Sequence, residues 1–251
     1  MAVNNYEIFR GSMIEFDGRG VPKSVLVVTP HPDDSELGCG GTIAKWISQG
    51  TEVTYLLCTN GDKGSSDPSI TSNELKRIRG QEIEEASKVL GIKNLVQLGY
   101  GDGELEDTSE FRERVVKNIR IFKPDVVMVT DPVRHKFYVH RDHRIAGQVV
   151  LDSLFPYARD RLHYIEHEAE GLTPHKVKTV MFWGSEEPDS YVDISAHLDT
   201  KIKALLKHKS QLSDNESENQ IDDLIEAVAL RAGAECGTKY AECFRTIQFT
   251  V

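Results

Sequence analysis

Residues 24–41, SVLVVTPHPDDSELGCGG, join an apolar run to a polar turn and a glycine cluster, and this order decides the fold class. The run Ser24–Thr29 is almost continuously apolar, which is typical of a strand covered on both faces in a parallel sheet. In open parallel sheets, ligands bind beyond the carboxyl ends of the strands. The turn His31–Asp34 carries an imidazole and two carboxylates, and it therefore lies where a site is expected.

The rest of the chain repeats this alternation of short apolar runs and longer helical patterns. Further strands are predicted at 52–59, 94–98, 125–130 and 179–183, and helices at 42–48, 74–90, 109–122, 144–154 and 194–208. The alternation predicts an α/β fold, a Rossmann-like three-layer sandwich with a mostly parallel central sheet. The polar, acidic stretch 213–223 is expected to be a solvated loop or the start of a helix.

The composition argues against several classes of function. The chain has 251 residues, a formal net charge of −10 and four cysteines without a C-x-x-C pair. The acidic excess argues against a nucleic-acid partner, because phosphate binding needs clustered Lys and Arg. We find no signal-peptide pattern and no apolar run of about 18 residues, so we expect no membrane association and a cytoplasmic location. A reducing compartment fits the cysteines.

Two polar clusters follow predicted strands, and a parallel sheet brings both to one edge. The first, His31–Asp34 (HPDD), is by itself also compatible with an ordinary turn, since Pro and Asp favour turns. The second, His140–His143 (HRDH), weakens that interpretation because its spacing can aim two imidazoles at one site. Zinc prefers His nitrogen and carboxylate oxygen, and catalytic zinc sites use three protein ligands plus water. We therefore predict a Zn²⁺ site formed by His31, Asp34 and His143.

The other polar residues of the two clusters are then available for the reaction. Asp33 is predicted to be the general base for a water whose pKa the zinc ion lowers to roughly 7. His140 is predicted to stabilise an oxyanion or to protonate a leaving amine. Asp142 is predicted to orient one of the imidazoles.

The sequences HPDDSE (31–36), GCGGTI (38–43) and HRDHRIAG (140–147) resemble the signature motifs of the LmbE-like (PIG-L) N-deacetylase superfamily. The resemblance covers nearly the whole chain and is strongest to the diacetylchitobiose deacetylase branch, through segments such as TNGDKGSSD (59–67) and KYAECFR (239–245). It implies a zinc-dependent hydrolase that removes the N-acetyl group from a small sugar containing N-acetylglucosamine. It also implies the zinc ligands and the base named above.

The resemblance adds residues to the predicted site. Arg79 and Asp102 match positions at which that branch keeps substrate-pocket residues, and Tyr138 matches a catalytic Tyr of the mycothiol-pathway relative. Without the resemblance, Arg79 would be interpreted as a solvated residue on a charged helix. Asp102, between two glycines, would be interpreted as a turn residue.

The resemblance also implies an overall organisation. Residues 1–251 are expected to form a single N-deacetylase domain, with a metal-site core at about 22–150 and elements at about 151–251 that shape the pocket and the oligomer. Diacetylchitobiose deacetylases assemble as hexamers, which implies a homo-oligomer here. The chain departs from the family pattern at Gly80, where a second Arg is frequent, and at Arg141, where Pro is common. Residues 160–175 match no known segment and are expected to help shape the pocket.

Several other residues are expected to be structural. His163 and His167 are predicted to lie on a surface helix or loop, and His197 and His208 to be exposed or half-buried. The glycines of the motif, Gly38, Gly40 and Gly41, lack the G-x-G-x-x-G spacing of dinucleotide-binding loops. They are expected to let the helix start pack against the metal loop.

Two other functions are considered beside the leading one. The first is a thiol-biosynthesis deacetylase that acts on an N-acetylglucosaminyl malate or inositol, and a basic pocket would favour it. The second is a non-catalytic nucleotide-binding domain that uses the same strand-end loops. The second is disfavoured because phosphate sites need backbone N–H groups and cations, whereas this turn offers Asp33 and Asp34.

Overall fold

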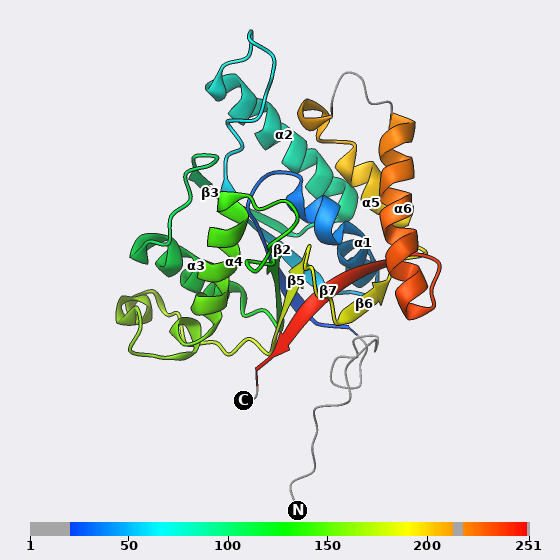
Figure 1. The fold of residues 1–251 in the computed structure, drawn as a ribbon. Coiled ribbons are helices and arrows are strands. Elements are labelled where there is room, and N and C mark those ends of the chain that lie inside the picture. The colour runs from blue at the N-terminus through cyan, green and yellow to red at the C-terminus, as the bar shows by residue number, and fades with distance from the viewer. Residues whose placement is uncertain (1–20, 213–217, 250–251) are drawn as a thin grey trace, which may run out of the picture.

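The structure, a computed structural model, describes residues 21–212 and 218–249. Their strands form a seven-stranded sheet in the order β3-β2-β1-β4-β5-β7-β6 (Figure 1). The strands are β1 (Ser24–Thr29), β2 (Glu52–Thr59), β3 (Asn94–Tyr100), β4 (Val126–Thr130), β5 (Thr179–Trp183), β6 (Ser190–Asp193) and β7 (Ala241–Gln248). Strands β1 to β5 are parallel, and β7 pairs antiparallel with both β5 and β6. The predicted mostly parallel sheet is confirmed.

Helices cover both faces of this sheet (Figure 1). The α-helices are α1 (Asp34–Ser48), α2 (Ser72–Leu90), α3 (Ser109–Phe122), α4 (Arg141–Leu154), α5 (Leu198–Leu205) and α6 (Glu218–Cys236), and the short 3₁₀ helices are η1 (Tyr157–Arg159), η2 (Ile165–Glu170) and η3 (Lys209–Gln211). Helices α1, α2, α5 and α6 pack together in one layer, and α3 and α4 form the other. The predicted three-layer sandwich is therefore confirmed. Among the described helices, none combines the length and the apolar character needed to cross a bilayer.

The sequence predicts the buried central elements better than the later ones. Strands β1, β2 and β5 and helix α3 have the predicted bounds. Helix α5 is shorter than predicted, covering 198–205 rather than 194–208. Strands β6 and β7 and helix α6 were not predicted, although residues 218–223 do begin α6, and 213–217 lie outside the described residues.

Local signals explain where the helices end. Helix α2 starts with a capping box in which Thr71 accepts the N–H of Glu74, and it ends at Gly91, whose φ of 84° is left-handed. The Thr108 side chain caps α3 by accepting the N–H of Phe111. These caps place the starts of both helices directly after the loops that follow β2 and β3, at the carboxyl edge of the sheet.

Helix α1 begins at Asp34 rather than at residue 42 and is kinked at Cys39, where φ is −148° and ψ is 17°. The predicted helix 42–48 is its second half. The glycines around the kink allow neighbouring elements to approach closely. A Cβ on Gly38 would lie 2.3 Å from the Trp183 ring, and one on Gly41 would lie 2.7 Å from Ile194. These contacts are to side chains of β5 and of the segment before α5, and the expectation that the glycines let the helix start pack against the metal loop stays a prediction.

At the kink, backbone N–H and C=O groups of α1 lack hydrogen-bond partners within the helix. A buried ion pair supplies those partners. The Glu242 carboxylate accepts the N–H groups of Gly41 at 2.9 Å and Thr42 at 2.7 Å. The Lys201 ammonium donates to the Leu37 carbonyl at 2.7 Å and pairs with Glu242. Both charged side chains are buried. Strand β7 and helix α5 therefore hold the helix that carries the polar turn.

The segment that matches no known family segment lies along α3. Arg120, 2% exposed, donates to backbone carbonyls of this segment and of the residues just before it, and it contacts the His167 ring. The accepting carbonyls belong to Tyr157, Ala158, Asp160, His163 and Tyr164. His167 is buried and its Nε2 lies 2.6 Å from Glu113, so its predicted surface position is wrong. His208 is also fully buried, close to Glu36, rather than exposed or half-buried.

We predict that Glu242→Gln lowers the free energy of unfolding by about 3–5 kcal/mol, because it leaves the buried Lys201 ammonium without its counter-charge. Urea unfolding followed by circular dichroism measures the change. Glu235→Gln, at an exposed position of α6, is the matched control and should change stability by less than about 0.5 kcal/mol. A Glu242→Gln protein as stable as this control would contradict the role given to the pair.

Candidate metal centre and active site

His31, Asp34 and His143 meet at the carboxyl edge of the sheet. His31 follows β1, Asp34 begins α1 and His143 lies in the first turn of α4. The Asp34 carboxylate lies between the two rings, with Oδ2 2.9 Å from His31 Nδ1 and Oδ1 3.0 Å from His143 Nε2. All three residues are buried. The structure therefore brings together the residues predicted to hold a metal.

The turn that carries these residues is tightly bonded. Asp33, directly before α1, has a φ of 110°, a region that residues other than glycine rarely adopt. The Thr29 hydroxyl donates to the His31 carbonyl at 2.8 Å, and the His31 N–H donates to Asp34 at 2.9 Å. The side chain at position 33 is thus held by a strained backbone that its surroundings stabilise.

Contacts behind the imidazoles fix their orientation. His31 Nε2 lies 3.1 Å from Asp142 Oδ2, and that buried carboxylate accepts the N–H groups of Gly103 and Leu105. His31 Nδ1 is the ring atom that faces Asp34. The predicted orienting position of Asp142 is thus seen in the geometry, and such partners set the tautomer and direction of a ligating imidazole.

His143 is oriented by a residue that the sequence analysis missed. Its Nδ1 lies 3.3 Å from the hydroxyl of Thr130, the last residue of β4. Arg134, also buried, donates to the same hydroxyl. In open parallel sheets, ligands bind at the carboxyl ends of the strands. Thr130 is the last residue of β4, so this rule could have identified it.

The donor set and its charge fit a metal cation. Burial lowers the pKa of His31, but hydrogen bonds to Asp102, Asp142 and Asp34 outweigh it and raise this pKa to about 12. These carboxylates therefore attract positive charge. The buried His143 Nε2 faces Asp34 Oδ1 at 3.0 Å, so an imidazole nitrogen and a carboxylate oxygen converge there. Both observations are expected of a site whose nitrogen and oxygen atoms bind a divalent ion.

More atoms converge here than three ligands require. Nitrogen atoms of His31, His140 and His143 lie within 4.8 Å of one another, and so do ligand atoms of His31, Asp102 and Asp142. The described residues therefore contain a His and Asp cluster that could hold a metal. Asp34 is the carboxylate in contact with both buried imidazoles of the predicted set, His31 and His143.

Arg79 reaches the cluster from α2. Its guanidinium passes over Gly61, where φ is 62° and a Cβ would lie 2.8 Å from Nε. Arg79 Nη2 donates to the Pro32 carbonyl at 2.7 Å and lies 3.3 Å from Asp33 Oδ2, and Nη1 lies 3.6 Å from Asp102 Oδ2. The side chain is 4% exposed, so the alternative of a solvated surface Arg is wrong.

The adjacent carboxylates of Asp33 and Asp34 have different surroundings. Burial and the charge of Asp34 raise the pKa of Asp33 to about 7, although the Arg79 charge opposes this. Burial also disfavours charge on Asp34, but the two imidazoles outweigh it and hold its pKa below the usual range. The Asp33 side chain is 25% exposed, whereas Asp34 is 10% exposed. Asp33 is thus the more accessible of the two.

His140 and Tyr138 complete the cluster on the α4 side. The His140 ring lies 4.7 Å from the His31 ring, centre to centre, and burial followed by the charges of His31 and His143 lowers its pKa. The Tyr138 ring lies 5.1 Å from His143, and its backbone has a left-handed φ of 46°. His140 also caps α4, which is why the helix begins at Arg141 rather than at residue 144. All predicted site residues therefore lie in one cluster.

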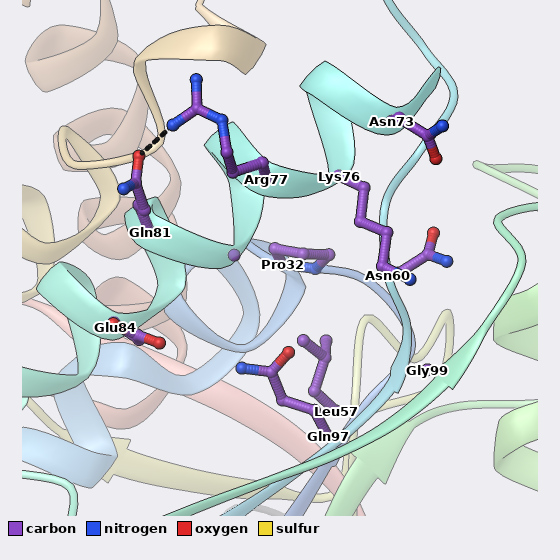
Figure 2. A pocket seen from close by; sticks show the side chains of 11 residues that line it. Pro32, Leu57, Asn60, Asn73, Lys76, Arg77, Gln81, Glu84, Gln97 and Gly99 are labelled. Atoms are coloured by element: carbon purple, nitrogen blue, oxygen red, sulfur yellow. Dashed lines mark hydrogen bonds between the residues drawn. The ribbon is translucent and has the colours of Figure 1, made fainter. Parts of the chain in front are cut away.

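A separate hollow of about 600 Å³ lies beside this cluster, between α2 and strands β2 and β3 (Figure 2). Pro32, next to Asp33, lines it, as do side chains such as Asn73, Lys76, Arg77, Gln81, Glu84 and Gln97. It also contains Gly80, the departure from the family pattern, where a Cβ would meet nothing within 4 Å. Its lining residues include no imidazole. We therefore assign the chemistry to the cluster of His and Asp residues.

Comparison with known proteins finds relatives whose names describe deacetylases. A family profile described as PIG-L: GlcNAc-PI de-N-acetylase matches residues 26–154. Diacetylchitobiose deacetylase from Thermococcus kodakarensis is 34% identical over 225 residues, which are 90% of this chain and 83% of that protein. The structure of N,N'-diacetylchitobiose deacetylase from Pyrococcus horikoshii has a TM-score of 0.84 and 32% identity, covering 90% of this chain and 84% of that one.

A further relative is a probable N-acetyl-alpha-D-glucosaminyl L-malate deacetylase 2 from Bacillus anthracis, which is 30% identical over 208 residues, 78% of this chain and 84% of that protein. The fold, the site and these relatives define a hydrolase of the deacetylase class. The chain belongs to the PIG-L family.

We predict that Asp142→Asn weakens divalent metal binding about 10–100-fold, because the amide cannot fix the His31 ring as the carboxylate does. Competition with a chelator, read by metal analysis of the protein, measures this affinity. Asp152→Asn lies on the same helix and bonds only to Gln148 among the contacts seen, and it serves as control. Equal affinity in both variants would contradict the orienting role of Asp142.

Proposed function

We propose that the protein is a zinc-dependent deacetylase that removes the N-acetyl group from a small sugar containing N-acetylglucosamine, of the diacetylchitobiose type. The observation that carries the proposal is the position of Asp33, a partly exposed carboxylate beside a buried cluster of two imidazoles and Asp34. The relatives from Thermococcus and Pyrococcus, whose names give this activity, support the substrate class.

Zinc is proposed as the metal, with His31, Asp34 and His143 as its ligands. Two imidazoles and a carboxylate are a ligand set common to catalytic zinc sites. When bound, a zinc ion supplies Lewis-acid chemistry and lowers the pKa of water to roughly 7. Asp102 and Asp142 remain bound to the outer nitrogen of His31, which keeps Nδ1 directed toward Asp34.

Asp33 is proposed to be the general base. It accepts a proton from the water that attacks the acetyl carbonyl carbon, and it then gives a proton to the departing amine nitrogen, so that acetate and the free amine leave. Arg79, within 3.3 Å of its carboxylate, holds it in place. Arg79 and Asp102 are also proposed to contact the sugar, as positions within the pocket.

His140 and Tyr138 are proposed to act at the carbonyl oxygen. His140 Nδ1 accepts the N–H of Asp142 at 3.2 Å, so in the neutral ring the proton is on Nε2. That N–H can donate to negative charge that develops on the oxygen during attack. The Tyr138 hydroxyl, on the exposed side of the cluster, is the second proposed donor.

The site bears differently on the two alternative functions. A deacetylase for N-acetylglucosaminyl malate or inositol uses the same metal chemistry and is separated from the leading proposal by substrate alone. A nucleotide-binding function is disfavoured, because the acidic cluster around His31 would repel phosphate. The cytoplasmic location, the homo-oligomer and the division of the single domain near residue 150 stay predictions.

We predict that Asp33→Asn retains zinc but lowers kcat about 10²–10⁴-fold, because the amide cannot accept the proton. Metal analysis and acetate release from N,N'-diacetylchitobiose test both parts. Asp152→Asn, on α4, removes a carboxylate that bonds Gln148 rather than the cluster, so it serves as the control and should retain most activity. An Asp33→Asn enzyme with the wild-type rate would contradict the mechanism.

The substrate class has its own test. The wild-type protein, loaded with zinc, should release acetate from N,N'-diacetylchitobiose with a higher kcat/KM than from N-acetylglucosaminyl malate or N-acetylglucosaminyl inositol. Removal of the metal with a chelator should abolish the reaction, and added zinc should restore it. A preference for the malate or inositol conjugate would move the proposal to the thiol-pathway alternative, and activity without metal would refute it.

A further inference from the structure

The loop 131–139, between β4 and α4, exposes apolar side chains beside the active site. Val133, Phe137, Tyr138 and Val139 are each about half or more exposed, and Phe137 is 71% exposed. The loop leads directly into His140. Adjacent exposed apolar side chains on a soluble domain commonly mark a binding surface.

The tip of this loop is held by one carboxylate. Glu186 Oε1 accepts the N–H groups of three successive residues, His135, Lys136 and Phe137, with distances of 2.9 Å to the first and 3.1 Å to the last. Successive N–H groups that converge on one anion form a compact, defined backbone conformation. Glu186 therefore fixes the part of the loop from which the Phe137 side chain projects.

Two further contacts anchor the base of the loop. Asp131 is buried and forms a two-point ion pair with Arg245, at 2.7 and 2.8 Å, and it also accepts the Val133 N–H at 2.9 Å. The buried Arg134 donates to the Trp183 carbonyl at 3.2 Å. The exposed aromatic side chains thus stand on an ordered backbone, and a preordered surface loses less entropy when it binds a ligand.

The aromatic rings lead outward from the metal cluster. The Tyr138 ring lies 5.1 Å from the His143 ring, and the Phe137 ring lies 6.4 Å from the Tyr138 ring, centre to centre. A sugar whose acetamido group is at the cluster would place its glycosidic neighbour farther out. Phe137 contacts Tyr138, is the more exposed ring of the two and has no assigned role in the reaction.

We propose that Phe137 forms the subsite for the sugar ring linked to the acetylated glucosamine, and that Glu186 is the positioning residue that holds it there. This inference rests on the proposed function. The flat face of an aromatic ring stacks against the C–H face of a pyranose, because both surfaces are apolar and leave water on contact. Such a contact distinguishes a disaccharide from a monosaccharide, because the monosaccharide does not reach it.

Steady-state kinetics of the zinc-loaded full chain test the proposal, with N-acetylglucosamine and N,N'-diacetylchitobiose as substrates. Phe137→Leu, which removes the flat ring, should lower kcat/KM for the disaccharide about 10-fold, mainly through KM, since the contact exists before and during the reaction. The same variant should change kcat/KM for the monosaccharide less than twofold. Phe137→Tyr, which keeps the ring, should behave as the wild type.

The second variant tests the positioning residue. Glu186→Gln removes the negative charge to which the three loop N–H groups donate, so it should weaken their hold on the loop and show the same selective loss on the disaccharide. Glu187→Gln, at the adjacent exposed position, is the matched control and should show none. Zinc content and circular dichroism should be unchanged in every variant, which separates the effect from misfolding.

Each outcome decides between the proposals. If the wild type releases acetate but Phe137→Leu affects both sugars equally or neither, the subsite is refuted and the deacetylase function stands. If Phe137→Leu changes the oligomeric state on size-exclusion chromatography together with both rates, the loop is a contact between copies of the chain, and the subsite is again refuted. If the wild type releases acetate from neither sugar, the proposed function itself fails.

Discussion

The charge gathered around His31 is the constraint on which the rest of the structure depends. Its ring lies within 3.2 Å of three carboxylates, from Asp34 at the start of α1, Asp102 in the loop after β3 and Asp142 at the start of α4. Like charges at such distances are costly to bury unless cations or hydrogen bonds compensate them. The protein supplies part of that compensation through Arg79 and through the N–H groups that bind Asp142. A bound divalent cation would supply the rest, which makes the arrangement intelligible as a metal centre.

The later part of the chain is needed to keep this centre in shape. The turn that carries His31 and Asp34 opens a helix with a kink, and a kinked helix leaves peptide groups without partners. Glu242 from β7 and Lys201 from α5 bond those groups. The helix that begins with the motif near the amino terminus therefore depends for these bonds on two elements near the carboxyl terminus. This dependence is consistent with one cooperative unit rather than a separable metal-site core.

The sequence predicts those elements whose bounds are set by local signals, such as apolar runs and helix-capping residues. The buried strands have unbroken apolar runs, and α3 has clear end signals at Thr108 and Pro124, so their bounds agree with the structure. Strand β6 lies at the edge of the sheet and β7 pairs antiparallel beside it. Both mix polar and apolar residues, because antiparallel strands are often partly solvated, and the sequence analysis does not predict them. The kink at Cys39 and the burial of His167 depend on partners distant in sequence, Glu242 and Arg120, which no local pattern shows.

The difference between local pattern and three-dimensional surroundings also distinguishes two neighbouring residues of the site, Asp33 and Asp34. Asp33 and Asp34 are chemically identical, and spacing alone gives no reason to assign them different roles. The helix start turns Asp34 toward two imidazoles, which favour its charged form, while Asp33, on a left-handed backbone, is left with the charge of Asp34 beside it. Two carboxylates whose environments drive their pKa values apart are suited to different tasks, one as a ligand and one as a proton acceptor. Backbone conformation at a single residue, rather than residue type, therefore gives the proposed ligand and the proposed base their different surroundings.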